Sequence, residues 1–311
     1  MRAIVTGGAG FIGSHVVDAL VARGDDVLVV DNLANGKRAR VNEGAEVVVG
    51  DIRDADTLRG AFDRFRPDAC FHLAAQADVR VSVDDPALDA DVNVIGTIRV
   101  LEAADRHGTQ VVFSSTGGAI YGECERPARE TDARRPLAPY GTSKLAGEEY
   151  LATYNRLYGS GHVSLRYANV YGPRQDPHGE AGVVAIFFGR LALGKPPRIF
   201  GDGRQTRDYV YVGDVATATV AAAGRSGGVF NIGTGVETSV LDLFEACRRV
   251  SGLELEPEFA PPRAGELSRS FLGPELAARE LGFRARTGLE EGLAQTWRSI
   301  QAEGEVAAGA N

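Results

Sequence analysis

Short apolar runs alternate with longer amphipathic segments through the first two thirds of the chain. Short apolar runs are typical of buried strands, and apolar positions three or four residues apart are typical of helices that cover a sheet. The pattern predicts strands at Arg2–Thr6, Asp26–Val30, Glu46–Val49, Ala69–Leu73, Val111–Ser114 and Val163–Tyr167, and helices at Gly10–Arg23, Thr57–Phe65, Pro86–His107 and Gly141–Tyr158. This alternation indicates an α/β fold, a Rossmann-type doubly wound parallel sheet.

The pattern loosens after Tyr171, where glycine and proline interrupt Gly172–His178 and Gly194–Gly203. The later strand-like runs are short and interleaved with helices, which favours a smaller C-terminal α/β lobe that binds the substrate. We expect a Rossmann domain over residues 1–170 and a mainly substrate-binding lobe over 171–311. We also expect some segments, at about 205–235, to return to the first domain.

The composition of the chain argues against several classes of protein. The 311 residues are 44% hydrophobic and carry a net charge of −8, which argues against a nucleic-acid binder because phosphate contacts need clustered Lys and Arg. Cys70, Cys124 and Cys247 stand far apart and the five histidines are scattered, so we expect neither disulfides nor a metal site. Without a secretory pattern or a membrane-length apolar run, we expect a soluble, cytoplasmic protein with no membrane partner.

A glycine-rich motif, Thr6–Gly13, follows the first predicted strand and opens the first predicted helix. Glycines there permit a tight turn whose backbone amides, with the helix N-terminus, can face a pyrophosphate. Asp31 ends the next strand, where a carboxylate binds a ribose 2′-hydroxyl and repels a 2′-phosphate, so NAD is favoured over NADP. Alone, the motif fits any glycine-rich turn, and Asp31 or Asp51 fits a turn acid or a helix cap.

Tyr140 and Lys144 are the candidate catalytic pair. They are four residues apart at the start of a predicted helix, so their side chains share one face. A nearby ammonium stabilises a phenolate, which a tyrosine needs in order to act as a base. The same spacing also fits a chance surface pair, and the interpretation gains from the preceding dinucleotide motif.

The hydroxyl residues Ser114, Ser115 and Thr116 lie at and directly after the end of the fifth predicted strand, Val111–Ser114. Open α/β sheets bind their ligands at this edge, so a hydroxyl there can hydrogen-bond a reacting oxygen. The alternative is that these residues form a turn or a cap. The sequence leaves open whether Ser115 or Thr116 makes the contact.

Together these motifs resemble the extended short-chain dehydrogenase/reductase family, and within it the UDP-galactose 4-epimerases. The resemblance covers nearly the whole chain. It includes the motifs above and His72–Gln76, Asn93–Thr97, Ser114–Gly122, Arg166–Gln175, Gly201–Val215 and Asn231–Gly233.

The resemblance implies a role for each matched residue at the cofactor. Tyr140 is the acid/base, Lys144 binds the nicotinamide ribose, and Thr116 or Ser115 contacts the sugar hydroxyl. The implied NAD site comprises Gly7, Gly10, Phe11, Ile12, Gly13, Asp31, Asn32, Asp51, Ile52, Leu73, Ala74, Ala75, Gln76, Asn93, Ser114 and Tyr167, together with Tyr140 and Lys144.

On the substrate side, Asn169, Arg207 and Arg263 match residues that hold the nucleotide diphosphate, for which forked guanidinium groups are suited. Val183 matches a further substrate contact. Ser270 matches a position that limits the size of the sugar 2-substituent, and its small side chain favours a pocket that also admits N-acetylated sugars.

The implied activity is NAD-dependent epimerisation at C4 of a UDP-hexose through a transient 4-keto sugar, in a homodimer joined through the helices near Pro86–His107 and Gly141–Tyr158. Alternatives are a 4-epimerase of UDP-N-acetylhexosamine or UDP-glucuronate, a nucleotide-sugar dehydratase and a non-catalytic NAD-sensing protein. The dehydratase needs a carboxylate directly after Thr116, where this chain has Gly117 and Gly118. The sensor has no need of Tyr140.

Overall fold

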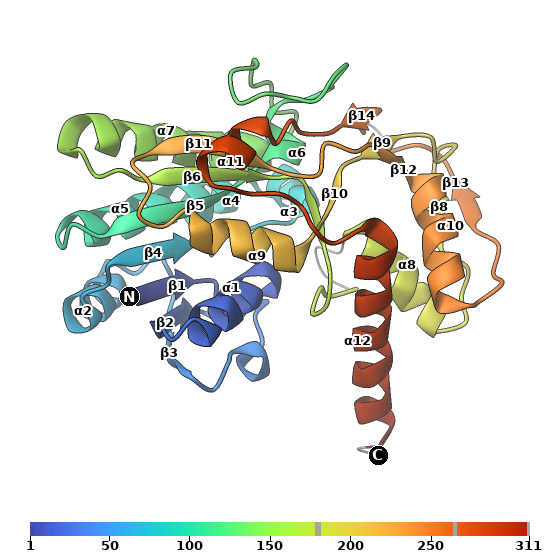
Figure 1. Cartoon of the computed structure of the whole chain (residues 1–311), viewed down its shortest axis with the longest axis horizontal. Helices are drawn as coiled ribbons and strands as arrows, with labels where there is room; N and C mark the ends of the chain where they lie inside the picture. Colours follow the sequence, from blue (N-terminus) through green and yellow to red (C-terminus); the bar gives the residue numbers. More distant parts are fainter. Residues whose placement is uncertain (178–181, 264–265, 310–311) are drawn as a thin grey trace.

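The computed structural model describes residues 1–177, 182–263 and 266–309. His178, Ala264 and Gly265, which belong to segments discussed above, lie outside the described residues. Figure 1 shows a parallel sheet with its helices on the left of the view and a second group of helices, including α10 and α12, on the right.

A parallel sheet forms the larger part. Among the described residues it has seven strands, in the order β3-β2-β1-β4-β5-β6-β11, and every neighbouring pair is parallel. The chain reverses its winding between β1 and β4, which is where such sheets bind ligands. The predicted Rossmann-type α/β fold is therefore confirmed. The strands are β1 Arg2–Thr6, β2 Asp26–Asp31, β3 Ala45–Val49, β4 Ala69–His72, β5 Gln110–Thr116, β6 Val163–Tyr167 and β11 Gly228–Ile232.

Helices cover both faces of this sheet, because most of its strand residues are apolar and buried on either side. One face packs against α1 (Phe11–Ala22), α9 (Val212–Ala221) and α11 (Glu275–Glu280). The other packs against α2 (Ala55–Phe65), α5 (Gly96–Asp105) and α7 (Pro139–Tyr158). Since α9 and β11 belong to this layer, the chain returns to it after it has entered the second lobe.

The helix expected over Pro86–His107 is interrupted. It comprises α4 (Pro86–Ala90), a π-helical turn (η2, Asp91–Ile95) and α5, and it is preceded by a short helix, α3 (Val79–Asp84), that the sequence did not predict. The Thr97 hydroxyl donates to the Asn93 carbonyl within the wide turn. Wide turns of this kind occur often at functional sites because they turn side chains inward, and Asn93 is buried here.

The second lobe has its own apolar core. It is built by α8 (Val183–Ala192), α10 (Val240–Ser251) and α12 (Leu289–Gly309), with Phe187, Phe244 and Trp297 among its buried residues. Short strands join this lobe to the sheet: β7 Asn169–Tyr171, β8 Arg198–Phe200, β9 Thr206–Arg207, β10 Tyr209–Tyr211, β12 Thr238–Ser239, β13 Glu258–Ala260 and β14 Arg269–Ser270. Two short helices, η1 (Arg38–Arg40) and α6 (Gly117–Ile120), complete the described elements.

Bilayer-spanning segments need about 20 consecutive apolar residues. Within the described ranges, none of the helices combines the length and the apolar character to span a membrane.

Candidate active site

The glycine-rich turn between β1 and α1 is lined by backbone. Gly7 has a φ of +73°, and a Cβ on it would lie 2.6 Å from the amide nitrogen of Ala74. A Cβ on Gly13 would overlap the carbonyl oxygen of Gly7. Gly10 caps α1 without a side-chain hydrogen bond, so the first helical amides remain available at the edge of the sheet. This cradle suits phosphate groups because amides and helix dipole both favour an anion.

Asp31 lies beside this cradle at the end of β2. Its carboxylate accepts hydrogen bonds from the amides of Ala9, at 2.9 Å, and Leu33, at 2.8 Å. Asp31 therefore ties the glycine-rich turn to the loop after β2, in addition to placing a negative charge at the ribose position expected from the sequence.

Asn32 and Asp51, from neighbouring strand ends, lie side by side. The Asn32 amide donates to Asp51 at 3.0 Å, and Arg53 binds the same carboxylate at 2.8 Å. The hydrogen bond from Arg53 holds the pKa of Asp51 well below its usual range. Ile52 is buried against Gly96 of α5. The end of β3 thus presents the negatively charged carboxylate of Asp51 next to the apolar side chain of Ile52.

The loop after β4 carries Leu73, Ala74, Ala75 and Gln76, all half-buried. The π-helical turn directs the Asn93 side chain inward, where it holds this loop. The side-chain oxygen of Asn93 accepts from the backbone amide of Gln76, and its side-chain amide group donates to the backbone carbonyl of Gln76. The same amide group donates to Ser143 of α7 at 3.1 Å. Asn93 thus joins the predicted cofactor loop to the predicted catalytic helix.

His72 is a structural residue behind that loop. Its two ring nitrogens lie 2.7 Å from the Thr6 hydroxyl and 3.0 Å from the Thr97 hydroxyl. Burial, with a smaller effect of the Lys144 charge, lowers its pKa to about 3, so it is neutral at ordinary pH. It links β1, β4 and α5.

The pair Tyr140 and Lys144 lies in the first turns of α7, which begins at Pro139. The Lys144 ammonium is buried, donates to the Ser114 carbonyl at 2.8 Å and lies 4.8 Å from the centre of the Phe113 ring. Tyr140 is half-buried one turn earlier. The helix therefore places a phenol and an ammonium on one face, against the end of β5.

The strand β5 separates the two candidate hydroxyls. Ser115 is buried and its hydroxyl donates to Glu148 at 2.5 Å. Thr116 projects from the opposite side, because successive residues of a strand alternate, and within the described part of the chain its hydroxyl caps no helix. This placement favours Thr116 over Ser115 as the hydroxyl that can meet a ligand. Ser114 contributes its carbonyl to Lys144.

Three further predicted cofactor residues pack within the protein. The Tyr167 ring is buried in the core under α9, with its hydroxyl 2.7 Å from that of Thr219. Phe11 contacts the His15 ring edge-on, and Ile12 packs on the core beneath the sheet. A contact of Tyr167 with a nicotinamide would therefore come from its ring and not from its hydroxyl.

The predicted substrate residues gather where the short strands meet. Arg207 in β9 is paired with Ser270 in β14, and its guanidinium lies 3.5 Å from Glu266. Asn169 in β7 donates its backbone amide to the Asp208 carbonyl. Arg207, Ser270 and Asn169 thus come from segments far apart in sequence. Ser270 is buried, and its side chain is small.

Arg263 and Val183 flank this group. The Arg263 guanidinium stacks over the Phe200 ring, 3.9 Å from its centre, which fixes its plane. Val183 begins α8. The residues that follow Arg263 in its predicted motif, Ala264 and Gly265, lie outside the described residues.

Two residues near Arg207 were missed from the sequence. Tyr209 is buried, and its hydroxyl has no hydrogen-bond partner among the described residues. Asp208 is buried and accepts from Thr234, Gly235 and Leu272. Burial raises the pKa of Asp208. Asp208 anchors the strand that carries Arg207, and Tyr209 offers an unused hydroxyl beside it.

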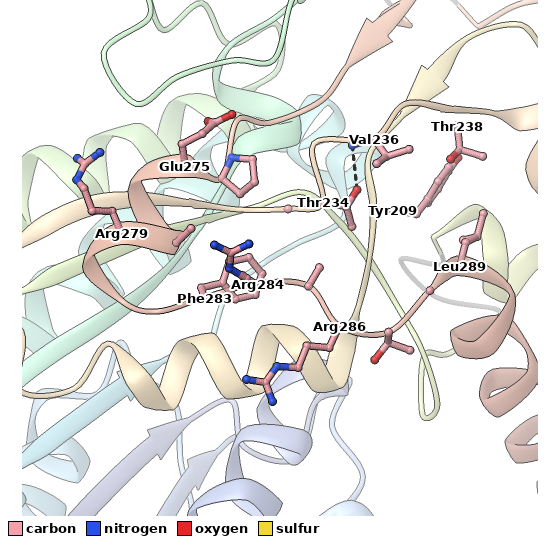
Figure 2. Close-up of a pocket in the computed structure, with 16 residues that line it drawn as sticks. Tyr209, Thr234, Val236, Thr238, Glu275, Arg279, Phe283, Arg284, Arg286 and Leu289 are labelled. Atoms are coloured by element: carbon pink, nitrogen blue, oxygen red, sulfur yellow. Dashed lines mark hydrogen bonds between the residues drawn. The ribbon is translucent and has the colours of Figure 1, made fainter.

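A separate cavity of about 780 Å³ lies behind this strand, bordered by Tyr209, Thr234, Arg284 and Leu289 (Figure 2). The Val236 amide donates to the Thr234 hydroxyl on its wall. None of the predicted site residues borders the cavity. In the described ranges, no group of three or more His, Cys, Asp or Glu residues that could hold a metal occurs.

Comparison with known proteins identifies the family. Residues 3–233 match the NAD dependent epimerase/dehydratase family. The chain is 49% identical to the UDP-glucose 4-epimerase of Mycolicibacterium smegmatis, over 95% of this chain and 97% of that protein. This chain belongs to the NAD-dependent epimerase/dehydratase family.

Solved structures agree with this family assignment. The UDP-glucose 4-epimerase of Thermotoga maritima, crystallised with UDP-glucose, superposes with a TM-score of 0.95 at 47% identity, over 97% of this chain and 99% of that one. The Thermus thermophilus UDP-glucose 4-epimerase in complex with NAD superposes with a TM-score of 0.92 at 48% identity, over 97% of this chain and 99% of that one.

The cradle found here fits the cofactor of the epimerase/dehydratase family. At Gly7 and Gly13 a Cβ would collide with neighbouring backbone, so glycine is needed for this tight turn, which leads directly into the first amides of α1. Asp31 lies beside the cradle, where we expect a carboxylate to accept a ribose 2′-hydroxyl and to repel a 2′-phosphate. The family description names NAD as the cofactor.

Replacing Gly13 by alanine should remove bound NAD, because the new methyl group would overlap the Gly7 carbonyl and deform the cradle. We expect the purified Gly13→Ala protein to release little NAD on denaturation, measured by chromatography, with a cooperative melting transition retained. Gly60→Ala is the matched control, since a Cβ there meets nothing within 4 Å. Full NAD content in Gly13→Ala would contradict the assignment of the cradle.

Proposed function

We propose that this protein interconverts UDP-galactose and UDP-glucose by epimerisation at C4, through a transient 4-keto sugar. The observation that carries the proposal is the placement of Tyr140 and Lys144 on one face of α7 beside the cradle, with Lys144 bound to the Ser114 carbonyl. The similarity to 4-epimerases over nearly the whole chain supports the choice of reaction.

Each residue at the end of β5 has a distinct task in this proposal. NAD, when bound, accepts the C4 hydride and later returns it. Tyr140, as phenolate, takes the proton from the 4-hydroxyl and gives it back. The Lys144 ammonium favours the phenolate because opposite charges attract, and its buried position limits screening by water. The Thr116 hydroxyl hydrogen-bonds the same sugar oxygen and orients it.

The nucleotide diphosphate is held on the other side of the site. Asn169, Arg207 and Arg263 supply the expected contacts, and we add the Tyr209 hydroxyl because it is buried and otherwise unsatisfied. The diphosphate replaces Glu266 as the partner of Arg207, which lies 3.5 Å from that carboxylate. Anchoring at the diphosphate leaves the sugar able to turn over between the two hydride transfers.

Elimination of water is disfavoured as the reaction. A 4,6-dehydratase needs carboxyl groups directly after the hydroxyl residue, whereas Thr116 is followed by Gly117 and Gly118. A side chain at Gly117 would collide with Leu272. Such a side chain would therefore require the Leu272 side chain to move.

The assembly we propose is a homodimer. Apolar residues are exposed along α3, α4, the π-helical turn and α7, including Val83 at 60% and Leu157 at 66%. A second copy would cover this surface with the helices expected from the sequence, since exposed apolar patches mark interfaces. We place the protein in the cytoplasm, where its three buried, unpaired cysteines stay reduced.

Tyr140→Phe should lose about 10²- to 10⁴-fold in kcat for UDP-galactose, because the acid/base hydroxyl is removed. The measurement is formation of UDP-glucose by chromatography, without added cofactor. Tyr150→Phe, an exposed tyrosine of the same helix, should keep the wild-type rate. An unchanged rate in Tyr140→Phe would refute Tyr140 as the acid/base, whereas a protein without turnover whose biological role survives Tyr140→Phe would favour an NAD-sensing protein.

Wild-type protein should also convert UDP-N-acetylglucosamine, since Ser270 is small and buried beside Arg207. Ser270→Tyr should abolish this turnover by filling the space, while UDP-galactose is still converted. Ser268→Tyr, two residues away and exposed, should leave both rates unchanged. Wild-type turnover of UDP-galactose alone would refute the broad pocket, and turnover of UDP-glucuronate alone would refute the proposed substrate.

The chain mass of 33.0 kDa should appear doubled in sedimentation velocity at micromolar concentration. Leu157→Glu should shift the protein toward monomer, because a charge would be buried against the partner copy. Leu193→Glu, at a residue of similar exposure just after α8, should not. A monomeric wild-type protein would disprove the proposed assembly.

A further inference from the structure

A buried ion pair, Glu148 and Arg166, joins α7 to the sheet and has no role in the reaction as described above. Arg166 of β6 donates to both carboxylate oxygens of Glu148, from Nε at 2.9 Å and from Nη2 at 2.6 Å. Each side chain of the pair is only 2% exposed. The Ser115 hydroxyl donates to the same carboxylate at 2.5 Å. The carboxylate thus joins α7, β5 and β6 at one point.

The pair extends into a longer network. The other terminal nitrogen of Arg166 donates to the Tyr121 hydroxyl at 2.6 Å, and that hydroxyl donates to Asn231 of β11 at 2.8 Å. The Asn231 amide reaches the carbonyls of Ala128, at 2.8 Å, and Gly273, at 3.4 Å. Gly273 follows β14 of the substrate lobe, so the network connects the catalytic helix to the segment that carries Ser270.

Glu148 lies on the same face of α7 as the two proposed catalytic residues. Tyr140, Lys144 and Glu148 are spaced by four residues, so they form one stripe along the helix. The helix approaches β5 so closely that a Cβ on Gly147 would lie 2.7 Å from the Phe113 ring. Any rotation or slide of α7 would therefore break the bonds of Glu148 and move Tyr140.

General stability does not explain the pair. Replacing a buried ion pair by apolar residues of similar volume is often neutral or stabilising, because desolvation offsets the attraction. A buried polar network in which every group is hydrogen-bonded instead makes the surrounding core rigid and specifies a single arrangement of its side chains. Here Ser115, which the pair holds, directly precedes the proposed catalytic hydroxyl, Thr116.

We propose that Glu148 and Arg166 are positioning residues for the reaction: they fix the rotation of α7 and the end of β5, so that Tyr140 and Thr116 face the same sugar oxygen, and their opposite charges cancel, so that Lys144 remains the cation that acts on Tyr140. The proposal rests on the proposed epimerase function. It adds two residues that touch neither the sugar nor the cofactor.

Other ionisable groups surround the pair. Lys144 is the nearest cation on α7, Glu130 lies on the segment before it with its carbonyl accepting from Arg166, and Tyr121 caps the guanidinium. Burial raises the pKa of Tyr121 to about 12, so this phenol stays neutral. Toward Tyr140, the neutral His72 faces Lys144, and Asp89 of α4 accepts from Asn93. Replacing either Glu148 or Arg166 by a neutral residue changes the net charge of this group of side chains by one unit.

The first test measures the pH dependence of kcat for Glu148→Gln. Its uncompensated Arg166 cation would favour the Tyr140 phenolate, so the acid limb of the profile should move to lower pH. Eight helical residues span about 12 Å, and a unit charge at that distance shifts the limb by up to about one pH unit at an effective dielectric constant of roughly 20. Glu148→Gln/Arg166→Met removes both charges and should return the limb to the wild-type pH.

The second test keeps the charges. Ser115→Ala removes only the hydroxyl link to Glu148, and we expect kcat to fall about 3- to 30-fold with KM for UDP-galactose nearly unchanged. Ser164→Ala is the matched control, because Ser164 on β6 is also 3% exposed and takes no part in the network. Ser115→Thr, which restores a hydroxyl, should recover part of the rate. Melting temperatures and NAD content of all variants would be recorded in parallel.

The outcomes separate this inference from the proposed function. If wild type converts UDP-galactose and Tyr140→Phe does not, the function stands. An unmoved acid limb in Glu148→Gln, or equal kinetics of Ser115→Ala and Ser164→Ala, would then overturn the positioning role alone. If Glu148→Gln does not fold, the positioning role is still tested by the comparison of Ser115→Ala with Ser164→Ala and by the double variant Glu148→Gln/Arg166→Met. An inactive wild type would refute the function first, and the network would lose its proposed role.

Discussion

The close approach of the β1 and β4 loops is the constraint on which the rest of the site depends. Gly7 and Ala74 lie so near each other that a Cβ on Gly7 would collide with the Ala74 backbone, and this contact sets the tight turn that leads into α1. It follows from the parallel pairing of β1 with β4 at the point where the chain reverses its winding. Because β5 continues the same edge, Thr116 and the first turns of α7 arrive next to the cradle.

Buried polar groups then fix the positions of the reacting residues. Asn93 joins the loop after β4 to Ser143 on α7, and Lys144 is bound to the end of β5. On the other side of the strand, Glu148 and Arg166 hold the same helix. The helix that carries Tyr140 is therefore held at two levels by hydrogen bonds within the core, an arrangement that suits the proposed reaction, in which the same proton is taken up and returned.

The substrate side is built on a different principle. Short strands from distant segments bring Arg207, Ser270 and Asn169 together, and Asp208 anchors them through backbone amides. Short strands bury little surface, so this part relies on specific hydrogen bonds and on the separate core of α8, α10 and α12. Differences between relatives that act on different sugars can arise here without disturbing the cofactor cradle, because the two parts have separate cores.

The sequence by itself determined the parallel α/β fold, the glycine cradle and the Tyr140–Lys144 pair, because these depend on local periodicity and on spacings within one element. It could not determine the interruption of the helix at Asn93, the buried position of Tyr209, the hydrogen bonds that Asp208 accepts, or which of Ser115 and Thr116 binds Glu148. Those depend on which side chains from distant segments meet. Adjacent hydroxyls look equivalent in a sequence, whereas the pleat of β5 directs one into the Glu148–Arg166 pair and the other away from it.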